Sequence, residues 1–151
     1  MALNKFYWIL SLPLGLGLTL ASPIMGQSMV YNEGADHFWS NPFNWTPFGT
    51  PTDQDSVLIS TGQATIFQSY LAEAAYVEIA SGAALKVKAD ISTSAFGNLT
   101  IRNSHATGLK NEGTLINHGE IIIEDADDYG ILNMGMIRND TLATITVDTV
   151  S

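Results

Sequence analysis

Four acidic side chains crowd into five consecutive positions, a density typical of sites for hard cations. Glu124, Asp125, Asp127 and Asp128 are interrupted only by Ala126. Ca²⁺ is bound by several oxygen atoms, often from one loop, so the run predicts a calcium site formed by these four carboxylates. The run lacks the Asp-x-Asp-x-Asp-Gly order of a calcium loop. The alternative is a solvated corner whose charge discourages aggregation at a sheet edge.

Trp39 and Trp45 lie in an aromatic, proline-rich stretch and allow two opposite interpretations. Indole rings that face solvent would bind carbohydrate by stacking, whereas rings that point inward would cover the open end of a sheet. The segment 27–52 lacks a regular hydrophobic period and directly precedes the first expected strand, 57–59. We therefore predict an N-terminal cap, and carbohydrate binding by the two tryptophans is the alternative.

The remaining polar residues do not form a recognisable catalytic set. Cleavage of an acidic polysaccharide needs carboxylates that converge on one face, with a basic residue or bound Ca²⁺. The acids near the expected strands are scattered instead: Glu78, Glu120 and Asp148. The histidines His37, His105 and His118 share no metal-ligand spacing and no nucleophile pattern. The sequence thus favours a protein that is not an enzyme and, calcium apart, has no cofactor.

The N-terminus has the layout of a secretory signal peptide, 1–26. Lys5 precedes an apolar run, 6–20, and small residues follow, including Ala21 and Gly26. The run is shorter than the ~20 residues that a membrane-spanning helix needs. We expect cleavage after Ala21 or Gly26, a secreted or cell-surface protein, and no integral membrane domain once the leader is removed.

The charge of the chain limits its partners. The net charge is −9, and removal of Lys5 with the leader leaves five bases against 15 acids, or 5 − 15 = −10. Such a charge disfavours nucleic acid and anionic membranes. The chain has no cysteine, so an exported domain must be held together by burial and backbone pairing without disulfides.

Apolar residues recur every 22 positions and indicate the elements that carry these side chains. One such column consists of Val57, Ile79, Ile101, Ile123 and Ile145. A second column lies two positions earlier and consists of Val77, Leu99, Ile121 and Ala143. The positions between them are polar except for Ile122: Ser56, Glu78, Thr100 and Thr144. This alternation predicts short strands with an inward column and an outward face.

A strand that returns at constant spacing predicts a solenoid. We expect an all-β fold, a short single-stranded right-handed parallel β-helix with about 22 residues per coil over 53–151. A β-sandwich is the alternative, but its loops vary in length and give no reason for constant spacing.

Glycines and asparagines repeat at the same spacing. The glycine pairs are Gly97 and Gly119, Gly108 and Gly130, and Gly113 and Gly135, and we expect corners with positive φ there. Asn111 with Asn133, and Asn117 with Asn139, predict ladders of amides stacked at the ~4.8 Å spacing of strands. Leu109 with Ile131, and Leu115 with Ile137, predict further inward pairs.

Two stretches resemble known families. Trp39, the pair 44–45, Pro51 and the Asp-x-Val-x-Ile run 55–59 resemble the opening of secreted bacterial surface proteins of Bacteroidetes type. The segments 79–85 and 97–101 resemble the right-handed β-helices of pectin-lyase-like and adhesin-like proteins, and the likeness covers about 37–148. It implies a non-catalytic structural or adhesive module whose partner is a glycan or another surface protein. The alternative it implies is a carbohydrate-binding or polysaccharide-degrading β-helix.

The last expected strand, 144–147, begins a new coil and carries no recognisable cap. An open strand edge recruits another strand. We therefore expect that the solenoid continues beyond this sequence, or that two molecules associate through the open C-terminal coil.

Overall fold

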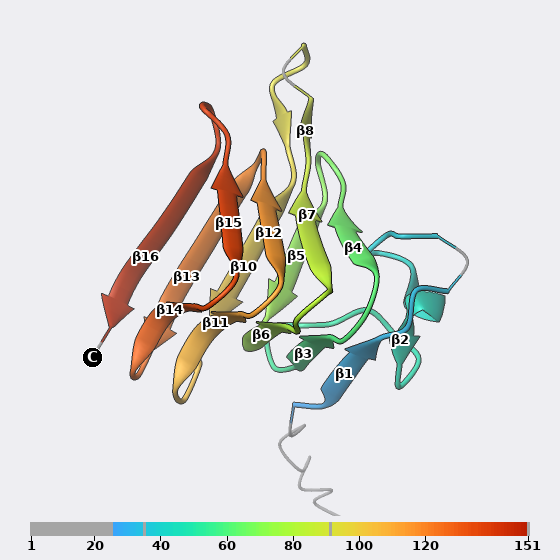
Figure 1. Ribbon diagram of the computed structural model, residues 1–151, viewed down its shortest axis with the longest axis vertical. Helices are drawn as coiled ribbons and strands as arrows, with labels where there is room; N and C mark the ends of the chain where they lie inside the picture. Colours follow the sequence, from blue (N-terminus) through green and yellow to red (C-terminus); the bar gives the residue numbers. More distant parts are fainter. Residues whose placement is uncertain (1–25, 35, 91, 151) are drawn as a thin grey trace, which may run out of the picture.

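The computed structural model describes residues 26–34, 36–90 and 92–150. Within them the chain is all-β, apart from one 3-10 turn, η1 (Pro42–Asn44), and three of its sheets contain parallel strands (Figure 1). No helix in this part of the chain is long and apolar enough to span a membrane. The predicted signal peptide lies outside the described residues, except for Gly26.

The first sheet has six strands in the order β14-β11-β6-β3-β1-β2, of which only β1 and β2 pair antiparallel. They are β1 (Ser28–Tyr31), β2 (Trp45–Thr46), β3 (Ser56–Ile59), β6 (Tyr76–Ile79), β11 (Thr107–Asn111) and β14 (Tyr129–Asn133). The first strand of the described chain is therefore β1, and the expected first strand, 57–59, belongs to β3.

Two further sheets are parallel throughout. The second sheet consists of β4 (Gln63–Ile66), β7 (Ala84–Val87), β12 (Thr114–Asn117) and β15 (Met136–Asn139). The third sheet consists of β5 (Leu71–Ala74), β10 (Asn98–Arg102), β13 (Glu120–Ala126) and β16 (Thr144–Val150). A separate antiparallel hairpin is formed by β8 (Ala89–Asp90) and β9 (Ala95–Phe96).

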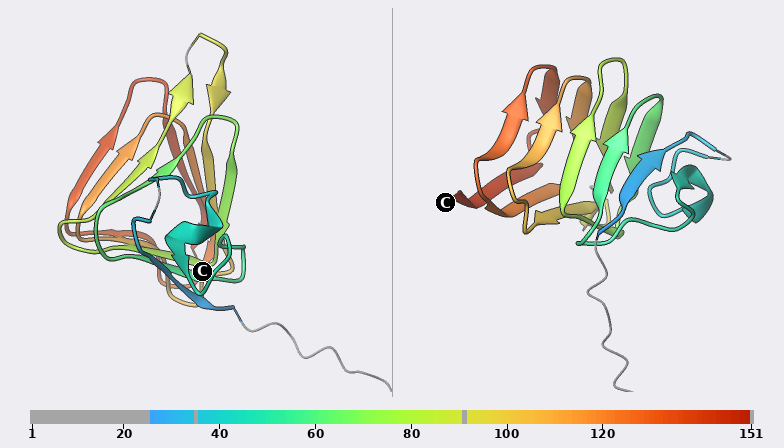
Figure 2. Two further views of the ribbon diagram at one scale, coloured as in Figure 1. Left: turned by 90° about the vertical axis from the view of Figure 1, so that its right-hand side faces the viewer. Right: turned by 90° about the horizontal axis from the view of Figure 1, so that it is seen from below.

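The chain visits the three sheets in turn. Its successive sets of strands are β3-β4-β5, β6-β7-β10, β11-β12-β13 and β14-β15-β16, and each set pairs with the one before it. The sets lie one behind another in Figure 2, and the β8–β9 hairpin projects from the edge of the stack. Since neighbouring strands come from segments far apart in the sequence, most of the fold depends on long-range pairing.

The predicted spacing is correct for four residue pairs, which join three pairs of strands that involve the third set. Leu99 pairs with Ile121, Ile101 with Ile123, Leu109 with Ile131, and Leu115 with Ile137. All of these side chains are fully buried except Ile131 and Ile137, which are partly buried and pack against the core. The spacing of inward residues therefore predicts the strand register correctly where partners in successive sets are separated by 22 positions.

The single column of five predicted residues is wrong. Val57 pairs with Val77 rather than with Ile79, and Ile145 pairs with Ile121 rather than with Ile123. The sequence separation between partners is therefore shorter than the predicted 22 positions in the first case and longer in the second. Moreover, Ile79 lies in the first sheet, whereas Ile101 lies in the third.

The physical reason for that change of sheet is the β8–β9 hairpin. It lengthens the connection between β6 and β11, so that Val77 pairs with Leu109 and not with Leu99. The residues that recur every 22 positions therefore do not all belong to the same sheet. Every position in it was still apolar, because each sheet buries its inner face.

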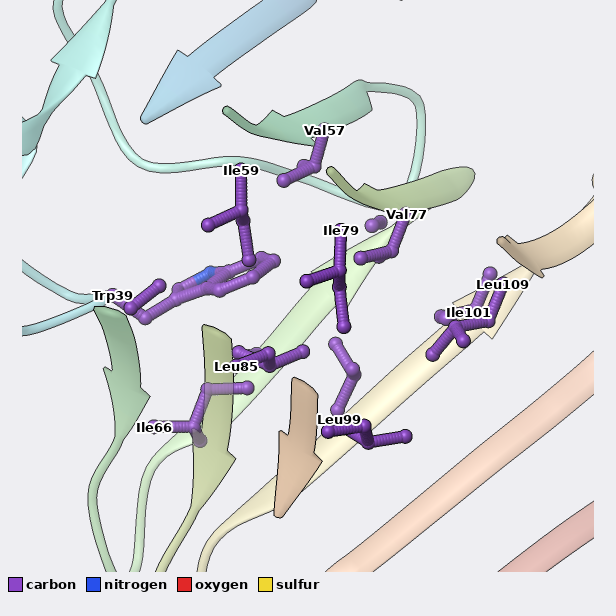
Figure 3. Close-up of a cluster of buried hydrophobic side chains, with 14 of the residues drawn as sticks. Trp39, Val57, Ile59, Ile66, Val77, Ile79, Leu85, Leu99, Ile101 and Leu109 are labelled. Carbon is purple, nitrogen blue, oxygen red and sulfur yellow. The ribbon is translucent and has the colours of Figure 1, made fainter. Parts of the chain in front are cut away.

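The three sheets enclose one continuous core. Figure 3 shows side chains from different sheets meeting there, among them Ile59, Ile66, Leu85 and Leu99, all fully buried. Thr100, expected on the outer face, is only 8% exposed, and its Oγ1 donates to Asn98 Oδ1 over 2.9 Å. A short polar side chain tolerates that position because its hydroxyl has a partner.

The predicted asparagine ladders are confirmed. Asn111 Nδ2 donates to Asn133 Oδ1, and Asn117 Nδ2 donates to Asn139 Oδ1, each over 2.7 Å. Asn117 Nδ2 also donates to Thr144 O over 2.8 Å, while its Oδ1 accepts from Gly119 N over 3.0 Å. Asn111 and Asn117 are fully buried, so these bonds satisfy groups that water cannot reach.

Replacing Asn117 by alanine should destabilise the protein by about 2–4 kcal/mol, because it leaves the buried N–H of Gly119 and the carbonyl of Thr144 without their side-chain partner. The matched change Asn139→Ala removes the same side chain from an exposed rung and should cost below about 1 kcal/mol. Urea unfolding followed by circular dichroism measures both losses. Equal losses in the two variants would mean that the ladder stabilises nothing beyond its local turn.

The repeating glycines are not corners with positive φ, so that prediction is wrong. Among the described glycines only Gly49, Gly62 and Gly82 have positive φ. A Cβ on Gly119 would instead collide with the backbone oxygen of Gly97 in the preceding set. Gly135 would meet Gly113 O in the same way. Gly119 and Gly135 are therefore needed because the backbones of successive sets approach too closely for a side chain, whereas a Cβ on Gly108 or Gly130 would meet the side chain of Ile123 or Val147.

The aromatic segment between β1 and β3 is held by a polar cluster around Asp36. Its carboxylate accepts from Phe38 N over 2.9 Å, Asn41 Nδ2 over 3.0 Å and Asn44 Nδ2 over 2.8 Å. The backbone bond from Phe38, followed by the amides of Asn44 and Asn41, lowers the pKa of Asp36. The folded-state pKa lies below the unfolded value, so this contribution to stability is lost as the pH falls through the folded pKa.

Candidate functional site

A charged network lies on the outer face of the first sheet. Lys110 Nζ contacts Glu78 Oε1 over 2.9 Å and Glu112 Oε1 over 2.8 Å, and Tyr76 Oη donates to Glu78 Oε2 over 3.1 Å. Glu78 and Lys110 are partners in the pairing of β6 with β11. The network therefore follows from outward positions on adjacent strands.

The network changes the acidity of its members. Burial, followed by the Glu78 charge and hydrogen bond, raises the pKa of Tyr76 to about 12. Hydrogen bonds to Glu112 and Glu78 raise the pKa of Lys110. The phenol is therefore neutral and the ammonium charged at physiological pH.

A cavity of about 650 Å³ adjoins this network. Tyr76 and Lys110 line one side, and the turn that contains His105 lines the other. The remaining wall is formed by Asp53 and Gln54, just before β3. Sequence reasoning did not predict this cavity, because its walls come from four segments that are far apart in the sequence, around positions 26, 53–56, 75–76 and 103–110.

Two smaller grooves flank the β8–β9 hairpin. One, which we call the hairpin groove, has a volume of about 550 Å³ and is lined by Phe67, Gln68, Lys86, Lys88, Ala89, Asp90, Ser92 and His118. The other, of about 400 Å³, is lined by Ala89, Phe96, His118, Arg138, Asp140, Thr141 and Leu142. Ala89 and His118 belong to both grooves, so His118 lies where the two meet.

The four carboxylates of the predicted calcium site do not converge. Glu124 lies 3.9 Å from Arg102 Nε, and Asp127 Oδ2 lies 3.8 Å from His105 Nδ1. Asp125 sits in a turn with φ 56°. In the part of the chain that the structure describes, no group of three or more acidic, histidine or cysteine side chains is placed to hold a metal ion.

Both tryptophans of the predicted carbohydrate site are inside the protein. Trp39 is fully buried and Trp45 is 3% exposed, their rings pack edge to face at 4.9 Å, and Trp45 Nε1 donates to Trp39 O over 2.7 Å. Neither ring offers a face to a sugar. The exposed aromatic pair of this segment is Phe43 and Phe48, whose centroids lie 5.1 Å apart.

Each histidine lies beside a carboxylate. His37 Nδ1 is 3.2 Å from Glu33, His105 is next to Asp127, and His118 Nδ1 contacts Asp140. His105 is almost fully exposed, whereas His118 is about one-quarter exposed. His118, with Arg138, lowers the pKa of Asp140 against the opposing effect of burial, which is the largest influence on that carboxyl.

Comparison with known proteins places most of the chain in one family. Residues 30–145 match the family described as a domain of unknown function, DUF8693, and the chain belongs to that family. No curated protein and no solved structure matches the chain.

Proposed function

We propose that the three parallel sheets are the faces of a short right-handed parallel β-helix that serves as a non-catalytic structural or adhesive module at a bacterial surface. The observation that supports it most is the in-register stacking of four three-stranded sets around one apolar core. Parallel crossovers are overwhelmingly right-handed, which favours that hand here. Stacked units that each contact only their neighbours are typical of solenoids.

The proposal assigns a role to each part of the molecule. The ladders of Asn111 and Asn117 hold adjacent coils rigidly, while the outer faces display charged and hydroxyl side chains. Rigid display suits adhesion, since little side-chain and loop entropy is lost on contact. The N-terminal resemblance to secreted bacterial proteins supports export to the cell surface.

Carbohydrate binding is the second candidate function. The exposed Phe43–Phe48 pair and the grooves beside the hairpin are the features that favour it. Polysaccharide degradation would further require a pair of converging catalytic carboxylates, with or without Ca²⁺.

The test is to express the full chain in a Gram-negative host and label intact cells with a reagent that cannot cross membranes. We expect labelled protein whose N-terminus lies between residues 22 and 27, because Gln27 N donates to Asp55 Oδ1 and Gln27 O accepts from Ser56 N, each over 2.8 Å. The purified protein should bind glycan-coated beads without producing new reducing ends. Unlabelled protein that retains Met1, or release of reducing ends, would contradict the proposal.

The last set of strands is also proposed to bind a second copy. Exposed apolar side chains gather on β14–β16 and their turns: Tyr129, Leu132, Met134, Met136, Leu142 and Val147. The strands β14, β15 and β16 are sheet edges, and such edges recruit other strands.

Val147→Lys places a charge on this apolar edge and should shift the protein from dimer toward monomer in light scattering. The control Leu71→Lys alters an apolar residue that is more exposed, 74% against 43% for Val147, on the opposite edge of the third sheet. A wild-type protein that is monomeric at about 100 µM, a concentration at which contacts of micromolar affinity saturate, would contradict self-association.

A further inference from the structure

The hairpin groove lies where the regular stacking is interrupted. Glu78 and Lys110, partners in β6 and β11, are separated by 32 positions in the sequence, whereas Asn111 and Asn133, partners in β11 and β14, are separated by 22. The additional length forms the β8–β9 hairpin, which projects beyond the stack (Figure 1). The sheets stay in register across this insertion. The hairpin therefore changes the shape of the surface rather than the packing of the core.

Two lysines in this groove differ from the other bases of the described chain. Arg102, Lys110 and Arg138 each contact a carboxylate. Within the described residues, Lys86 and Lys88 form no ion pair, although the chain is strongly acidic. Lys86 is the outward residue of β7, and Lys88 Nζ lies 4.4 Å from the centroid of the Phe67 ring.

The rest of the groove contains one carboxylate, that of Asp90, among polar and apolar side chains. Asp90 Oδ1 accepts from Ser92 N over 3.0 Å and from Ser92 Oγ over 2.6 Å, which fixes one carboxylate in the wall. Gln68 adds a neutral donor and acceptor, and His118 lies at the end of the groove next to Asp140. The Phe67 ring packs edge to face on Phe38 at 4.6 Å, so it forms a firm base under Lys88.

This combination of charges limits the ligand. Two cations attract an anion, but the Asp90 carboxylate and the net negative charge of the chain repel a polyanion. Hydroxyl groups, in contrast, can donate to Asp90 and Gln68 and accept from the lysines. The groove therefore fits a ligand with one anionic group among several hydroxyls.

We propose that the hairpin groove binds a sugar residue that carries a single carboxylate, with Lys86 and Lys88 contacting the carboxylate. The proposal rests on the adhesive function proposed above and names its ligand class. The carboxylate-bearing sugar would lie between the two lysines and the Asp90 wall, on the outer face of the second sheet. A neutral sugar would leave the lysines without their anionic partner.

The test uses polyacrylamide that carries either D-glucuronic acid or D-glucose, because the two sugars differ only in the carboxylate. Biolayer interferometry should give an affinity for the glucuronate polymer at least about tenfold higher than for the glucose polymer. Lys86→Gln and Lys88→Gln should each lower that affinity about tenfold. Arg102→Gln removes the same charge from β10 in the third sheet, outside both grooves beside the hairpin, and should leave it unchanged.

Melting curves matching the wild type will establish that each variant is folded. Equal binding of glucose and glucuronate polymers, or undiminished binding by the two lysine variants, would overturn the proposal. So would equally tight binding of poly-glutamate, since that would indicate a site for polyanions. If these binding tests fail while surface labelling and binding to glycan-coated beads succeed, the proposed carboxylated ligand is refuted and the proposed adhesive function is not.

Discussion

Ile123→Asp should leave the protein largely unfolded at 25 °C. Ile123 is fully buried on β13 between its partners Ile101 on β10 and Val147 on β16. The change removes about 2–5 kcal/mol of packing and adds the cost of a buried, unpaired carboxylate, several kcal/mol more. The sum approaches the about 5–15 kcal/mol that stabilises a typical domain. Circular dichroism and urea unfolding measure the loss.

The matched control is Ile122→Asp, the same change at the adjacent position of β13, whose side chain faces outward and is partly exposed. We expect a loss of about 1–2 kcal/mol there. The loss in Ile123→Asp should also shrink as the pH falls, because burial raises the pKa of the new carboxyl and protonation removes its charge. Equal tolerance at 122 and 123 would show that the orientation of β13 is wrong.

Trp39→Ala should destabilise the protein by about 3–5 kcal/mol, the cost typical of deleting a buried indole. Trp39 is fully buried and packs against the core in Figure 3 beside Ile59, and its backbone oxygen accepts from Trp45 Nε1. Its backbone N–H donates to Thr65 O over 2.9 Å, which ties the aromatic segment to β4. Differential scanning calorimetry gives the change in melting temperature.

Two further variants separate packing from other effects of Trp39. Trp39→Phe keeps an aromatic ring and removes the indole N–H, which has no partner inside the described protein, so its loss should be clearly smaller. Phe43→Ala truncates a ring that is 72% exposed and should change stability by less than about 0.5 kcal/mol. If Trp39→Ala melts like the wild type, the aromatic segment does not cover the core.

The sequence predicted register well only where local spacing was uniform. Leu99 with Ile121 and Asn117 with Asn139 are true partners because the steps that join them have the same length. Val57 and Ile79 were aligned wrongly, since a side-chain pattern shows which residues face inward but not which sheet they belong to. The 22-residue spacing by itself cannot show the hairpin insertion or the shorter first set.

The glycines illustrate a second limit of sequence reasoning. Their spacing indicated a structural constraint, and Gly119 does lie at a boundary between strands β12 and β13. The constraint is a close approach of two backbones, however, rather than a positive φ. A repeating glycine is compatible with a positive φ and with a close approach of two backbones. The backbone angles and the distance from the glycine to the neighbouring set of strands distinguish the two.

The candidate groove was less predictable than the fold. Lys86 and Lys88 were visible as bases in an acidic chain, but their lack of carboxylate partners depends on how the hairpin and Phe67 are placed. Trp39 and Trp45 are buried, and their role in covering the core stays a prediction, whereas the outward exposure of Phe43 and Phe48 required the geometry of η1.

The central structural claim is that strands from successive sets pair in parallel at the described register, and cysteine cross-linking tests it most directly. The chain contains no cysteine, so each introduced pair is unambiguous. Ile122→Cys with Thr146→Cys joins direct partners on β13 and β16, and Glu78→Cys with Lys110→Cys joins partners on β6 and β11. Adjacent strands lie about 4.8 Å apart, within reach of a disulfide.

The control pair is Ile122→Cys with Thr144→Cys, which a constant period would place side by side but which the described register offsets by two positions along β16. Mass spectrometry after mild oxidation should find intramolecular disulfides in both partner pairs and little in the control. Efficient cross-linking of the control with none between positions 122 and 146, or none in either partner pair, would contradict the parallel stacking on which the proposed β-helix depends.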